Sequence, residues 1–112
     1  MSMVEEQAAF LLHVSELVIY ATRQGFTVTG GELYRSAEQQ KIYVETGRSM
    51  TMNSNHLRRL AIDLNFFLGG KLVSEKNLLR DVGTFWENLD AKNRWGGNFK
   101  NLLDTPHFER NV

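Results

Sequence analysis

A histidine and an aspartate seven residues apart raise the first question about chemistry in this chain. His56 and Asp63 lie in the stretch S-N-H-L-R-R-L-A-I-D-L, which begins at Ser54, and His107 follows 44 residues after the aspartate. Two imidazoles and a carboxylate suit zinc, and three protein ligands leave a coordination position open, as in catalytic zinc sites. A simpler interpretation also fits, in which His56 ends a loop and Asp63 is a solvated residue at the start of a strand.

The seven-residue gap decides what the backbone must do if both residues bind one ion. Within a single helix the two side chains would lie about 10.5 Å apart along the axis, too far for metal–ligand bonds of about 2.0–2.2 Å. We therefore expect His56 on a loop or short turn, Asp63 on the strand that follows, and His107 on a neighbouring strand. The facial triad of iron oxygenases is a rival metal site, but its first histidine and carboxylate stand closer together, as H-x-D.

Composition narrows the other classes of function. With 112 residues the chain is expected to form one domain over residues 1–112. The absence of cysteine excludes disulfides and thiolate metal ligands. Thirteen basic and thirteen acidic residues cancel, so no nucleic-acid partner is expected. No apolar run approaches the roughly 20 residues that span a bilayer, so we expect no stable membrane association, and we expect a monomer.

Hydrophobic periodicity predicts an α+β fold with an antiparallel sheet, in the order helix, strand, helix, hairpin, helix, strand. Ser2 with Glu5 and Ser36 with Gln39 fit capping boxes, and Gly25 fits a helix stop. The expected elements are a helix ending before Gly25, strand 26–29, helix 36–45, loop 47–55, strand 61–67, hairpin 68–73, a helix over about 75–90 capped by Ser74, a glycine-bearing loop 94–100 and strand 105–110.

The same pattern predicts which faces are buried. In strand 61–67, Leu64 and Phe66 face the core with Ile62, and Asp63 lies on the opposite face. The helical stripes are Phe10, Leu11, Val14, Leu17, Val18 and Ala21 in the first helix, and Leu78, Leu79, Val82, Phe85, Trp86 and Leu89 in the third. His13 lies beside the first stripe, and we expect a structural or surface role for it rather than metal binding.

A longer pattern identifies a family. The segment S54-x-H56-x-x-x-x-A61-x-D63-L64, followed by D104-x-P-H107-F-E109, resembles the zinc D-Ala-D-Ala carboxypeptidases and L-Ala-D-Glu endopeptidases of the hedgehog/DD-peptidase superfamily. Residues 34–47 are similar to that family's arginine-bearing element, and W95-G-G-N-F resembles the stretch before its last ligand. The resemblance covers about residues 26–110. It implies a small antiparallel sheet packed against helices, with His56, Asp63 and His107 as ligands of Zn²⁺.

The resemblance also implies roles for residues beside the metal. Asp104, three residues before His107, would be the general base. Arg35 would bind the substrate carbonyl oxygen or stabilise the oxyanion; taken without the resemblance, it would simply pair with Glu32 or Glu38. Apart from the resemblance, Glu109 lies on the same strand face as His107, and we expect it to support His107 rather than bind the metal.

Three further positions carry expectations from the same comparison. Ser54 would hydrogen-bond near the substrate or orient the loop of His56. A tryptophan such as Trp95 is more often a core residue, but its place in a loop near the site also allows it to wall the substrate groove. Arg59 is a departure, because it stands where relatives often have glycine, and we interpret it as an altered loop rather than a lost site.

The function implied by the resemblance is hydrolysis of the peptide stem of bacterial peptidoglycan by an endolysin-like zinc peptidase of phage or prophage type. An L-alanyl-D-glutamate endopeptidase is favoured. A D-Ala-D-Ala carboxypeptidase or dipeptidase, and a non-catalytic zinc-stabilised binding module, are the alternatives. Two glutamates near the N-terminus do not fit a signal peptide, so we expect the protein in the host cytoplasm until it is released to the periplasm and cell wall.

Overall fold

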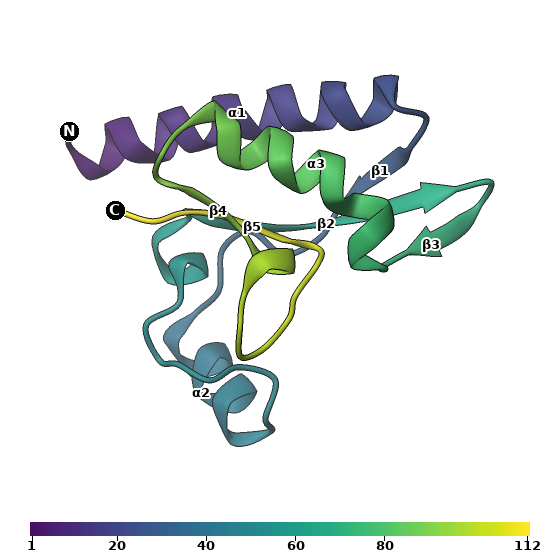
Figure 1. Cartoon of the computed structure of the whole chain (residues 1–112). Helices are drawn as coiled ribbons and strands as arrows, with labels where there is room; N and C mark the ends of the chain where they lie inside the picture. The colour runs from purple at the N-terminus through teal and green to yellow at the C-terminus, as the bar shows by residue number, and fades with distance from the viewer.

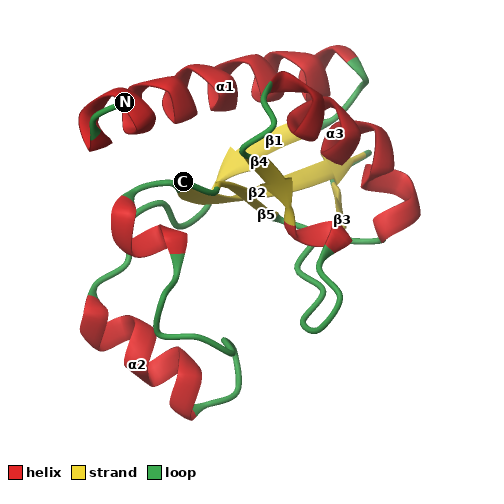
Figure 2. Ribbon diagram, turned by 60° about the vertical axis from the view of Figure 1, so that its left-hand side comes forward, coloured by secondary structure: helices red, strands yellow, loops and turns green.

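Two helices, α1 (Met3–Arg23) and α3 (Lys76–Leu89), pack together on one side of an antiparallel sheet, and the short helix α2 (Ala37–Glu45) lies on the other side (Figures 1 and 2). The computed structural model describes all residues, 1–112. The strands are β1 (Thr27–Gly30), β2 (Ala61–Leu68), β3 (Lys71–Val73), β4 (Asn93–Trp95) and β5 (His107–Arg110), with 3₁₀ turns η1 (Asn55–Arg58) and η2 (Gly96–Asn98). The predicted α+β class is confirmed. No helix is long and apolar enough to cross a membrane.

The long strand β2 organises the sheet. Its C-terminal half pairs with β1 and β3, and its N-terminal half pairs with β5, which in turn pairs with β4. All these pairings are antiparallel. The register places Asp63 opposite His107 and Arg94 opposite Glu109, so four charged or titratable side chains meet where β2, β5 and β4 run side by side.

One apolar layer between the helices and the sheet forms the core. Its buried side chains include Phe10, Val14, Leu17 and Ala21 of α1, Leu79, Val82 and Trp86 of α3, and Leu64, Phe66 and Phe108 of the sheet. Leu11 and Leu78 were predicted in this layer, but they are 60% and 56% exposed. Each follows or precedes a buried residue by one position, a turn of about 100° around the helix, which places it outside the narrow buried stripe.

The helix ends follow the sequence signals, with two corrections. The capping box predicted at α2 is half formed, because the Ser36 hydroxyl accepts from the Gln39 N–H but the Gln39 side chain makes no return bond. Ser2 and Glu5 form the predicted capping box, and Gly25 at φ +101° follows the C-cap of α1. At the start of α3 the prediction was wrong, because the N-cap position is Glu75 and it makes no side-chain capping bond. Ser74 instead offers its backbone carbonyl to the Thr105 hydroxyl at 2.8 Å, which ties the start of α3 to the segment before β5.

The loop predicted over residues 94–100 begins with a strand. Only three residues of β4 pair, and they pair only with β5, which is too short a pattern to produce a periodic signal. Within it Trp95 is 1% exposed, and its Nε1 donates to the Thr105 carbonyl at 2.8 Å. Trp95 is therefore a core residue, and the prediction that it walls a substrate groove is wrong.

Trp95 has room in the core because α3 carries glycine beneath it. A Cβ built on Gly83 would lie 2.1 Å from Trp95 Cε3. We expect Gly83→Ala to destabilise the protein by about 1–3 kcal/mol through overpacking, although alanine has the higher helix propensity. Urea denaturation measures the change, and Thr84→Ala on the exposed face of the same helix is the control. A Gly83→Ala protein as stable as the control would contradict this packing.

Candidate metal centre

Three side chains from different elements converge beneath the sheet. His56 comes from η1, Asp63 from β2 and His107 from β5. Asp63 Oδ1 lies 3.5 Å from His56 Nε2 and 3.5 Å from His107 Nδ1, and one atom of each residue lies within 4.8 Å of the others. Ligands of a tetrahedral zinc with bonds of about 2.0–2.1 Å stand about 3.4 Å apart. The arrangement therefore fits one ion. As predicted, His56 lies on a turn, Asp63 on the strand that follows and His107 on a neighbouring strand.

Two atoms of this group have no hydrogen-bond partner in the protein. His56 Nε2 and Asp63 Oδ1 are both buried and unpaired. Buried polar atoms in folded proteins nearly always have a partner, and leaving one unpaired costs about 1–3 kcal/mol. A metal ion bound between them would satisfy both atoms. The residues present therefore fit the zinc that the family resemblance implies.

The backbone around His56 fixes which of its nitrogens faces the site. The Ser54 hydroxyl accepts from the His56 N–H at 3.2 Å and caps η1, so Ser54 orients this turn, one of its two predicted roles. His56 Nδ1 lies 2.8 Å from the Leu33 carbonyl. An Nδ1–H donating to that carbonyl leaves the Nε2 lone pair free for a metal.

Arg59 closes the same turn in a left-handed conformation. Its φ is 57° and its ψ is 36°, at the C-cap of η1. Glycine adopts this conformation without the steric cost that a side chain brings, which explains why glycine suits the position. In this chain the Arg59 guanidinium lies 4.3 Å from the centre of the Tyr34 ring. The substitution thus alters a surface contact and leaves the path of the backbone to His56 in place.

The charges at the site are strongly coupled. Burial would raise the pKa of Asp63, but the neighbouring imidazoles of His107 and His56 outweigh it and hold that pKa well below its usual range. Burial opposes a charge on His107, but Asp63 and Glu109 outweigh it and raise the pKa of His107 to about 9. Without a metal, His107 is therefore a cation at neutral pH, held between two carboxylates.

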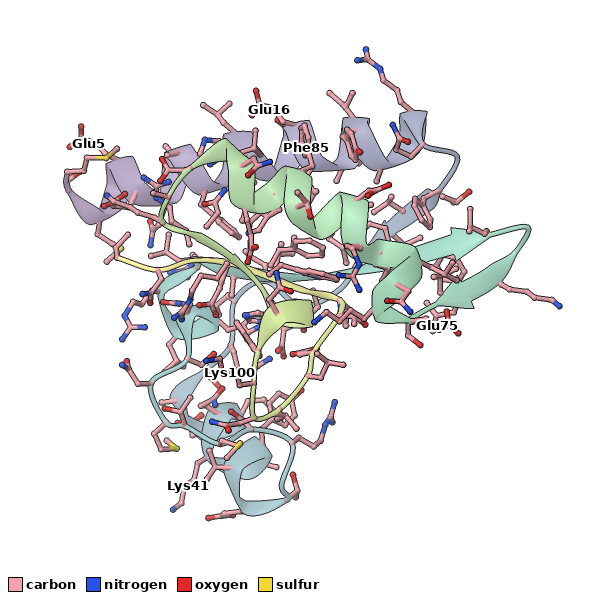
Figure 3. All side chains as sticks on the ribbon, in the orientation of Figure 1. Glu5, Glu16, Lys41, Glu75, Phe85 and Lys100 are labelled. Carbon is pink, nitrogen blue, oxygen red and sulfur yellow. The ribbon has the colours of Figure 1, made fainter.

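A cleft of about 1120 Å³ opens over the three candidate ligands. Its walls come from the segment 48–58 on one side and the segment 99–107 on the other, with Glu32, Arg35 and Tyr43 at the end nearest α2. In Figure 3 the labelled Lys100 lies on the second wall and Lys41 lies on α2, both on the side of the sheet away from α1 and α3. Trp95 is absent from the lining.

The two remaining predicted site residues lie in this cleft. Asp104 Oδ2 is 3.9 Å from His107 Nδ1, and its side chain is 45% exposed. Burial raises the pKa of the Asp104 carboxyl above its usual range, although the His107 charge opposes that shift. Arg35 is 10% exposed and pairs with Glu32, as an arginine outside the family pattern would. Arg35 also lines the cleft. Its ion pair with Glu32 and a position beside the candidate ligands are therefore not alternatives.

Several residues that shape the site carried no signal in the sequence. Gln40 is fully buried, and it bonds to Arg35 Nη1 at 2.8 Å and to the Thr51 carbonyl at 2.6 Å. It lies in a helix with no apolar stripe, so nothing distinguished it from a solvated glutamine. Arg94 was predicted to lie in a loop. Its contact with Glu109 could be predicted only if β4 was predicted as a strand paired with β5. His13 packs against Trp86 with ring centres 6.3 Å apart and is not part of the metal group.

Known proteins are similar to this chain in sequence and in fold. Residues 47–110 match the profile of a family described as D-alanyl-D-alanine carboxypeptidase. The L-alanyl-D-glutamate peptidase of Listeria phage A118 is 32% identical over 101 residues, which cover 86% of this chain and 34% of that protein. The chain thus spans about a third of the length of this curated relative. The crystal structure of the Serratia marcescens L-Ala D-Glu endopeptidase ChiX matches with a TM-score of 0.67 and 26% identity, over 84% of this chain and 74% of that chain.

The titration of His107 predicts how the metal-free protein responds to pH. The imidazole has a pKa of about 6.5 when unfolded and about 9 when folded. Its contribution to stability is therefore complete below about pH 6.5 and is lost as the pH rises through about 9. We expect the free energy of unfolding, measured in urea with a chelator present, to fall across this window. His107→Gln should flatten the profile, and a wild-type profile that rises would contradict the assignment.

The left-handed turn at Arg59 predicts an unusual ranking of substitutions. Arg59→Gly and Arg59→Ala both remove the Tyr34 contact, but only alanine keeps the steric cost of positive φ. We expect the glycine variant to be more stable by about 1 kcal/mol in urea denaturation. Arg80, exposed in α3, is the matched control, because there glycine should be less stable than alanine by about 1 kcal/mol. The same ranking at both positions would contradict the strained turn.

Proposed function

The chain belongs to the D-alanyl-D-alanine carboxypeptidase family, and from this we propose that it is a zinc-dependent peptidase acting on the peptide stem of bacterial peptidoglycan. The observation that carries the proposal is the pair of buried unpartnered atoms, His56 Nε2 and Asp63 Oδ1, which face His107 in an open cleft. Two histidines and one carboxylate leave room in the coordination sphere for a reactant. A purely structural zinc site would be closed by a fourth protein ligand.

The bond we propose is that between L-alanine and D-glutamate. The relative from the Listeria phage and the structural neighbour from Serratia are both named for this bond, and the phage source supports an endolysin role. The family description names D-Ala-D-Ala cleavage instead, which makes a carboxypeptidase the second candidate. Both substrates carry a free carboxylate on the residue that supplies the leaving amine, so the same cleft chemistry serves either.

A zinc ion held by His56, Asp63 and His107 would supply Lewis-acid polarisation of the scissile carbonyl and would lower the pKa of a water molecule. The protein supplies the proton transfers. Asp104 lies beside the three ligands, accepts the proton of the attacking water and passes it to the leaving amine. Because partial burial raises its pKa, its carboxylate is a stronger base than a fully solvated aspartate.

Arg35 supplies fixed positive charge for the oxygen of the scissile carbonyl. A guanidinium has five N–H donors, and here Glu32 and Gln40 occupy Nε, one N–H of Nη2 and one of Nη1. One N–H on each terminal nitrogen remains for the substrate. Donors held in place before reaction stabilise developing charge without reorganising, so the bonds to Glu32 and Gln40 orient Arg35 for this role.

Digestion of purified peptidoglycan by the zinc-loaded protein tests the proposal. We expect mass spectrometry of the released muropeptides to show new amino-terminal D-glutamate, with loss of D-alanine alone identifying the second candidate. In the same assay Asp104→Asn should reduce the rate by about 10²–10⁴-fold and retain one zinc per chain, because Asp104 removes a proton and does not hold the metal.

Asp81→Asn, on the exposed surface of α3, is the matched control and should digest at the wild-type rate. Loss of zinc from Asp104→Asn would make Asp104 a metal ligand and contradict its assignment as the base. A zinc-loaded wild type that releases no fragment would overturn the enzymatic function and leave a zinc-stabilised binding module.

A further inference from the structure

We infer that Arg94 is a positioning residue for the metal centre, acting on His107 through Glu109. The inference rests on the proposed metal site, and it assigns a role to a residue outside the set His56, Asp63, His107, Asp104 and Arg35. Arg94 lies on β4 directly opposite Glu109 on β5. Arg94 binds the Glu109 carboxylate, and that carboxylate contacts the His107 imidazole.

The contacts divide the Glu109 carboxylate between two partners. Arg94 Nε donates to Glu109 Oε2 at 2.8 Å, and Arg94 Nη2 contacts the same oxygen. The other oxygen, Oε1, lies 2.7 Å from His107 Nε2. The Glu109 side chain is only 7% exposed, so it cannot exchange these partners for water without local opening. Each oxygen therefore has one fixed role.

This division determines which nitrogen of His107 is offered to a metal. A carboxylate accepts hydrogen bonds and does not donate them, so its contact requires an N–H on His107 Nε2. The lone pair of neutral His107 is then on Nδ1, the atom that lies 3.5 Å from Asp63 Oδ1. If Glu109 rotated away, the ring would lose the partner that fixes both its tautomer and its orientation.

Arg94 is suited to prevent that rotation. Its Nε and Nη2 both contact one oxygen of Glu109, so the guanidinium orients the carboxylate as well as balancing its charge. A lysine has one compact ammonium group and would orient the carboxylate less well. Arg94 is 50% exposed, so solvent screens its charge and limits its contribution to stability, and the buried Glu109 carboxylate still has His107 as a partner when Arg94 is removed. Its effect should therefore appear at the metal centre rather than in the fold.

Lys92 provides a matched control in the same region. It pairs with the buried Glu6 at 2.8 Å, and its side chain is 41% exposed. This pair resembles Arg94–Glu109 in exposure and in joining a surface cation to a buried carboxylate. Glu6, however, contacts Lys92 and Arg110 and none of the three candidate ligands.

Zinc affinity, measured by competition with a chelator and without substrate, tests the inference. We expect Arg94→Met to bind zinc about tenfold more weakly, Arg94→Lys to lie between it and wild type, and Lys92→Met to be unchanged. Because Arg94 acts through Glu109, adding Arg94→Met to Glu109→Gln should weaken binding no further. If Arg94→Met does not fold, Arg94→Gln removes the same charge and carries the same expectation.

A spectroscopic readout separates positioning from general destabilisation. In the zinc-loaded protein labelled with ¹⁵N-histidine, the Nε2–H proton of His107 should be protected from exchange with solvent. Its exchange rate should rise in Arg94→Met and stay at the wild-type value in Lys92→Met. Equal zinc affinity and equal Nε2–H protection in the two variants would overturn the inference and leave the metal site intact. A wild type that bound no zinc would overturn the metal site and the inference with it.

Discussion

The antiparallel pairing of β2 with β5 is the constraint on which the site depends, because it sets Asp63 opposite His107. Side chains alternate between the faces of a strand, so a slip of one residue would turn every side chain of β5 to the opposite face. The apolar neighbours prevent that slip. Phe108 is fully buried against Phe66 and Trp86, and it can remain there only if His107 and Glu109 point to the polar face. The core therefore fixes the positions of Asp63 and His107, two of the three candidate ligands.

His56, the third candidate ligand, is positioned by its own turn rather than by strand pairing, because η1 is outside the sheet. Its turn is capped by Ser54 at one end and closed by the left-handed Arg59 at the other. The segment that carries Asp104 is held by close backbone approach: a Cβ on Gly96 would lie 2.0 Å from the Asp104 carbonyl oxygen. Gly96 thus lets the segment of Asp104 pass close to His107, one of the three candidate ligands.

The sequence predicted the parts of this arrangement that long periodic patterns control. Helices α1 and α3 and strand β2 have repeated apolar positions, and the ligand set followed from residue type, spacing and family resemblance. The strand β4 is three residues long, so it produced no pattern, and the core position of Trp95 and the contact of Arg94 with Glu109 were missed with it. Gln40 was missed for a different reason, since its burial depends on the loop 47–55 folding over α2, which no local signal in that polar loop indicates.

The buried charges explain why so small a core can support a polar centre. His107 lies between Asp63 and Glu109, and these carboxylates keep it protonated at neutral pH in the absence of metal, so its positive charge offsets their negative charge there. A zinc ion held by His56, Asp63 and His107 would take the place of that proton at Nδ1, and the hydrogen bond at Nε2 would remain. Two atoms, His56 Nε2 and Asp63 Oδ1, are left without partners when only the proton is present. A protonated His107 therefore balances the charge of the metal-free site, and the two unsatisfied atoms are the ones that the proposed ion would pair with.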